Sequence, residues 1–153
     1  MLLAYRLVKL IETHADQLAA GVFERLQSCS KTSAFRNVPA DEFKQRVYEI
    51  YHCLGDWLLG KAESEIEERY TEIGRRRAEQ GVPLSQVIWA INLAKRYLLE
   101  FLAEQVGPEK TAEIFGELEV LQLLEQFFDR ASYYAAIGYE STHAPLVARA
   151  AGQ

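Results

Sequence analysis

The sequence predicts an all-α fold, an antiparallel bundle of four to five long helices. Apolar residues recur at steps of three and four along most of the chain, as on one face of a helix. Glycine and proline interrupt this pattern at few places, and no segment alternates apolar and polar residues as a strand does. A globin-like arrangement of the same helices is the alternative, because periodicity does not fix the angles at which helices cross.

We expect three amphipathic helices in the N-terminal half of the chain. Their predicted ranges are 3–28, 39–60 and 63–80, with a loop at 29–38. Pro39 suits the first turn of the second helix, where its missing N–H costs no hydrogen bond. Gly60 suits the end of that helix, because glycine tolerates the left-handed conformation that often follows a helix.

Two further helices, at 83–106 and 109–139, are richer in apolar residues. We expect Gly107–Pro108 to break the chain between them, because proline in a helix interior removes a backbone hydrogen bond. Apolar side chains spread beyond one face of each helix, so each must be covered on more than one side. The last two helices are therefore expected to form the centre, enclosed by the first three helices or by a second subunit.

The chain has the size of one domain, at 153 residues. We place this domain at residues 1–140. Residues 141–153 are expected to form a flexible tail or the start of a linker.

Composition and charge argue against several classes of protein. The net charge of −5 does not suit nucleic acid, whose phosphates are bound by basic surfaces. Two cysteines, Cys29 and Cys53, are too few for a disulfide framework. No stretch reaches the roughly 18 apolar residues of a membrane span, and the N-terminal segment lacks a clear signal-peptide cleavage site. We therefore expect a cytoplasmic protein that binds neither nucleic acid nor membrane.

Motifs for catalysis and metal binding are weak or missing. No nucleophile or phosphate-loop motif occurs, so we expect no enzyme. Two Glu-x-x-His motifs, Glu49–His52 and Glu140–His143, are the kind that di-iron bundles use. His52 is expected to face solvent, about half a turn from the apolar face of its helix, and His143 lies in the expected tail. We therefore predict no metal and no cofactor; a haem- or di-metal-binding bundle ranks last among the alternatives.

Three polar residues fall on apolar helix faces and are candidate ligand-binding residues: His14, Arg77 and Lys95. We interpret His14 as a histidine at the edge of the core, hydrogen-bonded to a neighbouring helix; a ligand contact or a pH-sensitive contact is the alternative. A buried, unpaired charge costs several kcal/mol, so Arg77 and Lys95 need partners. A salt bridge to a carboxylate such as Glu42 or Glu125 is the favoured interpretation. If the three residues converge on a cavity, they would bind a small acid.

Aromatic residues of the last helix are candidate interface residues. Phe127, Tyr133 and Tyr134 lie beside its main apolar face. Aromatic side chains of this kind anchor contacts between subunits. We expect a homodimer that uses this helix, although a role in the core would explain the same pattern.

Four segments carry a resemblance to a known family: Ile11–Ala19 (IETHADQLA), Leu54–Leu58 (LGDWL), Gly74–Val87 (GRRRAEQGVPLSQV) and Lys95–Arg96. They resemble the N-terminal domain of RsbRD-type proteins, the RsbT co-antagonists of the bacterial stressosome. The resemblance covers most of the chain, from about Leu7 to Tyr139.

The resemblance implies a dimeric sensory input domain that is joined to an output module. In that family the output is often a phosphorylatable STAS domain, and related domains precede kinases or DNA-binding regulators. Because no such module follows here, we expect either a fragment of a longer protein or a domain that acts on a separate protein. The expected function is a non-catalytic signal-transduction input in a stress response, which binds a small ligand or a protein partner and responds by rearranging helices or subunits. A structural dimerisation or scaffold module is the alternative.

Overall fold

A computed structural model of the chain describes the backbone of residues 2–58, 60, 63–116 and 118–151, and the side chains of 5–58, 60, 63–104 and 122–142. Over these residues it contains α-helices, one 3₁₀ helix and no strand. In chain order the elements are α1 (Leu2–Thr13), α2 (Ala15–Ser28), η1 (Ser30–Asn37), α3 (Ala40–Leu58), α4 (Ser64–Glu79), α5 (Leu84–Gly116) and α6 (Leu118–Ala151). The predicted all-α fold is confirmed.

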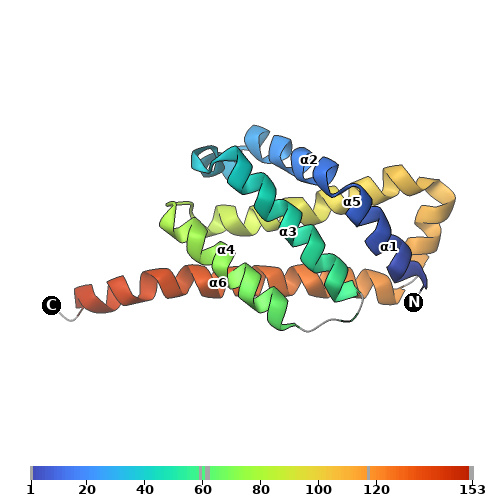
Figure 1. Cartoon of the computed structure of the whole chain (residues 1–153). Helices are drawn as coiled ribbons and strands as arrows, with labels where there is room; N and C mark the ends of the chain where they lie inside the picture. Colours follow the sequence, from blue (N-terminus) through green and yellow to red (C-terminus); the bar gives the residue numbers. More distant parts are fainter. Residues whose placement is uncertain (1, 59, 61–62, 117, 152–153) are drawn as a thin grey trace.

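The helices pack around α5 and α6, which run antiparallel along the length of the molecule (Figure 1). α2 packs on both α3 and α5, and α1 packs on α3. α4 crosses α6 and makes its most extensive contact with it. Leu98 of α5 and Phe127 of α6 are fully buried, so the other helices of the same chain cover the two apolar helices at these positions.

The first predicted helix is two helices, which meet at His14. This residue has φ −110° and ψ 16°, outside the α-helical range, and it separates α1 from α2. Backbone hydrogen bonds continue across it, from His14 N to Leu10 O and from Leu18 N to His14 O. The junction is therefore a kink, which the unbroken apolar periodicity of this segment did not reveal.

The predicted loop at 29–38 is mostly a 3₁₀ helix, η1. The buried Thr32 of η1 donates a hydrogen bond of 2.8 Å from its hydroxyl to the carbonyl of Leu26. That carbonyl lies in the last turn of α2, where helix carbonyls lack partners of their own. The 3₁₀ helix is therefore attached to the end of α2.

The two C-terminal helices differ from the prediction at their ends. The prediction that Gly107–Pro108 ends the fourth helix was wrong, because both residues lie within α5. The α5 ribbon instead turns sharply in its C-terminal part (Figure 1), and a proline can bend a helix without ending it. α6 continues to Ala151, beyond the predicted end at Tyr139, and its C-terminal turns project from the other helices (Figure 1). That residues 141–153 lead into a linker stays a prediction.

Over the described residues, no helix combines the length and the apolar character that a membrane span requires.

Candidate functional site

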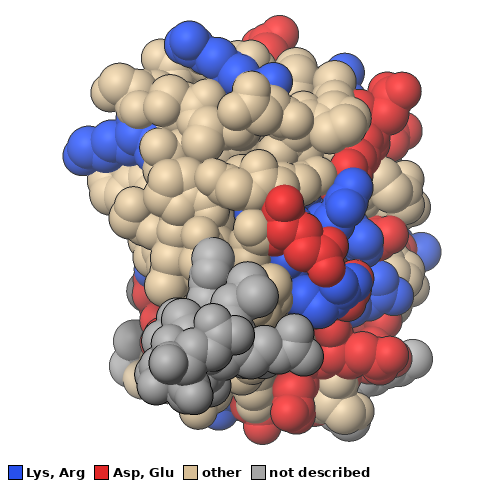
Figure 2. Space-filling model, turned by 90° about the vertical axis from the view of Figure 1, so that its left-hand side faces the viewer, with Lys and Arg blue, Asp and Glu red and all other residues tan. Residues whose placement is uncertain are grey.

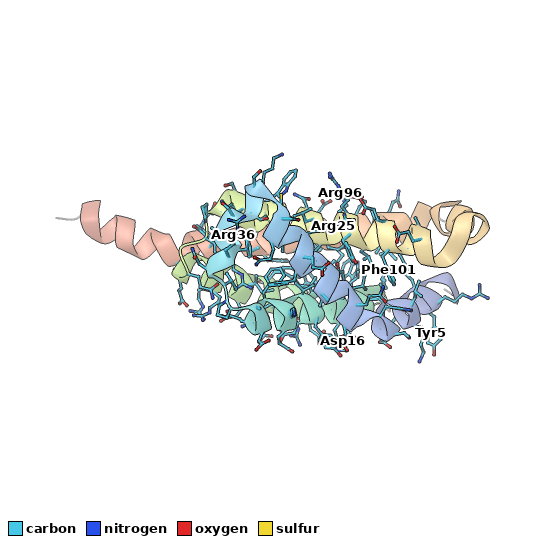
Figure 3. All side chains as sticks on the ribbon, turned by 90° about the horizontal axis from the view of Figure 1, so that it is seen from above. Tyr5, Asp16, Arg25, Arg36, Arg96 and Phe101 are labelled. Atoms are coloured by element: carbon cyan, nitrogen blue, oxygen red, sulfur yellow. The ribbon has the colours of Figure 1, made fainter. Side chains whose placement is uncertain are left out.

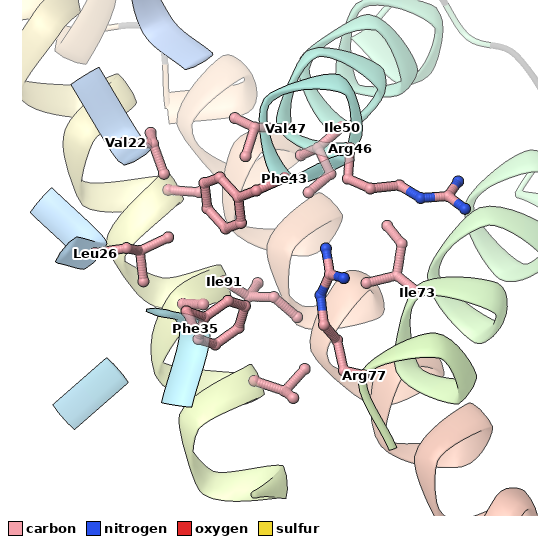
Figure 4. A pocket seen from close by; sticks show the side chains of 13 residues that line it. Val22, Leu26, Phe35, Phe43, Arg46, Val47, Ile50, Ile73, Arg77 and Ile91 are labelled. Atoms are coloured by element: carbon pink, nitrogen blue, oxygen red, sulfur yellow. The ribbon is translucent and has the colours of Figure 1, made fainter. Parts of the chain in front are cut away.

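A cavity of about 40 Å³ lies among α2, η1, α3, α4 and α5 (Figure 4). Its lining is apolar except for two arginines, Arg46 of α3 and Arg77 of α4. The apolar walls include Val22, Leu26, Phe35, Phe43, Val47 and Ile91. A single water needs roughly 10–15 Å³ of such space, so the cavity has room for about three water-sized groups. We call it the Arg77 cavity.

Arg77 is buried in the last turn of α4, with 3 % of its side chain exposed. It follows Tyr70 and Ile73 on the apolar face of that helix, and its guanidinium points into the cavity (Figure 4). Nη1 donates a hydrogen bond of 2.7 Å to Oε1 of Gln80, and it lies 3.4 Å from Oε1 of Glu42. Burial lowers the pKa of Arg77 below its ordinary value, because removal from water disfavours a charged group.

Glu42 forms an ion pair with Arg77. Its carboxylate accepts hydrogen bonds from Nε of Arg76 at 2.9 Å and from Nε2 of Gln80 at 3.1 Å, in addition to the Arg77 contact. The Arg76 hydrogen bond, followed by the charges of Arg76 and Arg77, lowers the pKa of Glu42. Glu42 lies in the first turn of α3 and the arginines in the last turn of α4, where each charge also complements the helix dipole.

One carboxylate therefore serves two arginines at the edge of the cavity. The second lining arginine, Arg46, pairs with Glu49 at 3.1 Å. Farther out, Arg75 forms exposed ion pairs with Glu72 and Glu79. Figure 2 shows basic and acidic side chains intermingled on one side of the end view, with a largely neutral area on the other side. This face therefore carries no broad basic patch.

His14 and Lys95 lie outside the Arg77 cavity. Nδ1 of the half-buried His14 donates to the carbonyl of Leu10, four residues earlier, at 3.0 Å, so the prediction of a hydrogen bond to a neighbouring helix was wrong. The ring of His14 lies 5.2 Å from the ring of Phe101. Seen from above, Phe101 lies some way along the molecule from Arg36 of η1, one of the elements that line the cavity (Figure 3).

Lys95 connects α5 to α6. Its Nζ lies 2.5 Å from Oε2 of Glu125. The expected salt bridges are therefore both present, between Arg77 and Glu42 and between Lys95 and Glu125. The structure does not bring His14, Arg77 and Lys95 together: Arg77 lines the cavity, whereas the other two have separate partners.

The candidate interface residues occupy three different environments. Phe127 is fully buried, edge-on to the rings of Tyr70 and Phe128, so its contact with a second subunit would require the core to open. Tyr133 is 62 % exposed. Tyr134 is half-buried, and its hydroxyl donates to Glu63 at 3.2 Å.

α4 and α6 are in close backbone contact at a place that we call the glycine crossing. It is formed by Thr71 and Gly74 of α4 and by Ala135 and Gly138 of α6. A Cβ added at Gly74 would lie less than 3.0 Å from the carbonyl oxygen of Ala135. A Cβ added at Gly138 would meet the carbonyl oxygen of Thr71 equally closely. Real Cβ atoms essentially never make such contacts. Glycine at both positions is therefore required for the two backbones to lie this close.

The candidate metal motifs gain no support from the described residues. His52 is exposed, as predicted, and the side chain of His143 lies outside the described part of the chain. Among the described residues, no group of three or more His, Cys, Asp and Glu side chains is placed to hold a metal ion.

Sequence reasoning found Arg77 and its partner Glu42 but missed Arg46, Gln80 and the glycine crossing. Arg46 could have been found, because it follows Phe43 by three residues and so borders the apolar face of its helix. The glycines could not, since their role depends on which helix lies opposite.

A family model described as the RsbT co-antagonist protein rsbRD N-terminal domain matches residues 12–153. No curated protein matches the chain.

Proposed function

Because the chain belongs to the family of N-terminal domains of RsbT co-antagonist proteins of the rsbRD type, we propose that it is the non-catalytic input domain of a stress-signalling protein. In this role a ligand or protein partner changes the packing of the helices, and α6 conveys the change to an output domain or to a separate signalling protein. A switch of this kind requires that the ligand or partner bind two states of the domain with different affinity.

The observation that carries the proposal is the connection between the Arg77 cavity and α6. Arg77 and Gly74 are three residues apart on α4, so the cavity and the glycine crossing are separated by about one helical turn. At the crossing the two backbones leave no space for an added carbon. A displacement of α4 at the cavity must therefore either move α6 or separate the two helices.

α6 is suited to transmit such a displacement. It is a single helix of 34 residues, about 50 Å long at 1.5 Å per residue. Ala131 and Ala135 are fully buried within the core, whereas the C-terminal turns of the same helix project from the other helices (Figure 1). A rotation or shift imposed in the core would reach those turns without crossing a loop.

The proposal is tested by substitutions that part the two helices. Gly138→Ala places a Cβ against the carbonyl of Thr71, while Gly55→Ala on α3 places one at 3.5 Å from Cγ1 of Val8, an ordinary contact. In host cells that carry a reporter of the general stress response, Gly138→Ala should change basal or induced expression by about fivefold or more, because a coupling of about 1–3 kcal/mol is typical of allosteric proteins. Gly55→Ala should respond as the wild type does.

The amount of each protein is measured by immunoblot and its fold by circular dichroism. A folded Gly138→Ala protein at normal abundance, with an unchanged stress response, would contradict the relay through α4 and α6.

The proposed partner at the surface of α6 is a second copy of the chain. Tyr133 is 62 % exposed, and Ile137, one turn later, is 38 % exposed. Aromatic and aliphatic pairs of this kind are common in subunit contacts. Tyr133→Glu should shift the chain from dimer to monomer in sedimentation experiments, whereas Tyr48→Glu, at another exposed tyrosine on α3, should not.

A structural scaffold is the second candidate function, favoured by the same exposed pair on α6. The two functions differ in what Tyr133→Glu and Gly138→Ala do. A scaffold depends on assembly, so it would lose function with Tyr133→Glu and keep it with Gly138→Ala. An input domain is sensitive to Gly138→Ala even when assembly is unchanged.

A further inference from the structure

The Arg77 cavity combines an apolar chamber with a cation that is nearly removed from water. Eleven of its 13 lining residues are apolar and the other two are arginines. A guest that fills this space must present a non-polar part to the walls and an acceptor to the remaining N–H groups of Arg77, since a buried N–H group without a hydrogen bond is costly. A purely apolar guest would meet only the first requirement.

The guanidinium has hydrogen-bonding capacity to spare. Arginine carries five N–H donors arranged in a planar fork. Within the described part of the chain, both hydrogen bonds of the Arg77 guanidinium come from Nη1, to Gln80 and to Glu42. Nε and Nη2 are therefore available to an acceptor, and a carboxylate is the group whose two oxygens match two neighbouring N–H donors.

The charge around the guanidinium also favours an anion. The Glu42 carboxylate is shared with Arg76, whose Nε lies closer to it than Nη1 of Arg77 does, at 2.9 Å against 3.4 Å. Arg76 also pairs with Glu79 at 3.7 Å, and Glu42 meets Arg77 through a long contact to Nη1 alone. A carboxylate on the cavity side of the guanidinium would add a second pairing, in surroundings where burial strengthens electrostatic attraction.

The size of the cavity limits the anion. About 40 Å³ is open, which corresponds to about three water-sized groups. Acetate, with a carboxylate and one methyl group, is close to this size, while longer acids would require the walls to move. Phosphate offers no apolar part to the walls of the cavity.

We infer that the Arg77 cavity binds a small monocarboxylate of about the size of acetate, with its carboxylate on Arg77 and its methyl group against the wall formed by Phe43 and Ile91. This inference rests on the proposed input role, for which it names the chemical class of the signal. Binding would hold Arg77, and with it the last turn of α4, about one helical turn from the glycine crossing.

The test is a titration of the purified chain with sodium acetate, followed by NMR of the methyl groups of Val22, Leu26 and Ile91 and of the Arg77 Nε–H. Ionic strength is held constant with sodium chloride. Acetamide, which has the same shape without the charge, is the matched neutral probe. Saturable shifts with acetate, and about tenfold weaker or no binding of acetamide, are expected, because a charge-assisted pair is about twice as strong as a neutral hydrogen bond.

Two variants separate charge from volume. Arg77→Met removes the cation, and Ala90→Leu fills the cavity from α5 while leaving Arg77 in place. Each should weaken acetate binding by about tenfold or more, because the carboxylate loses its bidentate partner or its space. Arg75→Met, at an exposed arginine of the same helix, should bind acetate within about twofold of the wild type.

The inference is wrong if acetate produces no saturable shift, if acetamide binds as well as acetate, or if Arg75→Met weakens binding as much as Arg77→Met. Circular dichroism establishes that each variant is folded. If Arg77→Met does not fold, the acetamide comparison and Ala90→Leu decide the result. If the chain binds acetate but Gly138→Ala leaves the stress response normal, the ligand assignment stands and the relay through α4 and α6 is wrong. If Gly138→Ala alters the response but acetate does not bind, the relay stands and the ligand assignment is wrong.

Discussion

The glycine crossing and the Arg77 cavity lie about one turn apart on α4 and are packed in opposite ways. At the crossing, Gly74 and Gly138 allow two backbones to touch, and an added Cβ would meet a carbonyl oxygen. At the cavity, large apolar side chains surround a buried arginine and leave about 40 Å³ unfilled. α4 is therefore fixed to α6 on one side and has room to move on the other. A change in packing is therefore expected to begin at the cavity and to be passed on at the crossing.

The largest effect is expected at the crossing itself. Gly74→Val should lower the free energy of unfolding by about 3 kcal/mol or more, because the backbone carbonyl of Ala135 cannot move aside as a flexible side chain can. Urea unfolding followed by circular dichroism measures the change. Gly55→Ala is the control, with an expected effect of under about 1 kcal/mol that is stabilising, since alanine favours the helix over glycine. Equal effects of the two substitutions would contradict the close contact of α4 and α6.

The second prediction compares two buried tyrosines, one that bonds to a residue of the cavity and one that packs against α6. The hydroxyl of Tyr51 donates to the carbonyl of Ala94, a cavity residue, at 2.9 Å. The ring of Tyr70 packs edge-on against Phe127 of α6, and its buried hydroxyl has no hydrogen-bond partner among the described residues. Tyr51→Phe should destabilise the chain by about 1 kcal/mol, and Tyr70→Phe should stabilise it by a similar amount, because an unsatisfied buried hydroxyl costs free energy.

Urea unfolding of the two variants measures this difference, and each serves as the control for the other. If Tyr70→Phe destabilises the chain as much as Tyr51→Phe does, the Tyr70 hydroxyl has a hydrogen-bond partner in solution.

The smallest effect concerns the pH dependence of the cavity edge. The pKa of Glu42 is lowered in the folded chain, so its contribution to stability is fully present above the unfolded value of about 4.3 and is lost as the pH falls through the folded value. Glu42→Gln should lower stability at neutral pH by about 0.5–1 kcal/mol and have no effect at a pH below both values. Thermal unfolding from pH 7 to pH 2 checks this. A constant difference between the two proteins across that range would show that Glu42 contributes through packing and not through its charge.

Much of the fold could be predicted because it depends on local periodicity. The apolar face of α4 placed Arg77 among Tyr70 and Ile73, and the cost of burying a charge predicted its pairing with a carboxylate. The break at His14 could not be predicted, since apolar residues continue at helical spacing on both sides of it. The continuation of α5 through Gly107–Pro108 was missed because the local sequence around a proline does not distinguish a bend within a helix from the end of a helix.

The candidate site could be predicted only in part. The sequence left open whether Arg77, Lys95 and His14 converge on one pocket. In the structure Arg77 pairs with Glu42 and Lys95 pairs with Glu125. His14 packs against Phe101. Phe127 and Tyr133 belong to the same helix and similar residue classes, but one is fully buried and the other mostly exposed. The local sequence predicts on which face of a helix a residue lies, but it does not predict which element covers that face.

The sequence by itself determined that this chain is helical, which residues line each helix face, and that a buried arginine would need a carboxylate, because periodicity and desolvation act within one helix. Only the tertiary structure decided which helices touch, that two glycines bring α4 and α6 into backbone contact, and that a cavity remains beside Arg77. These features depend on the shapes of helix surfaces that are far apart in the chain. No single helix specifies whether two such surfaces fill the space between them or leave a cavity.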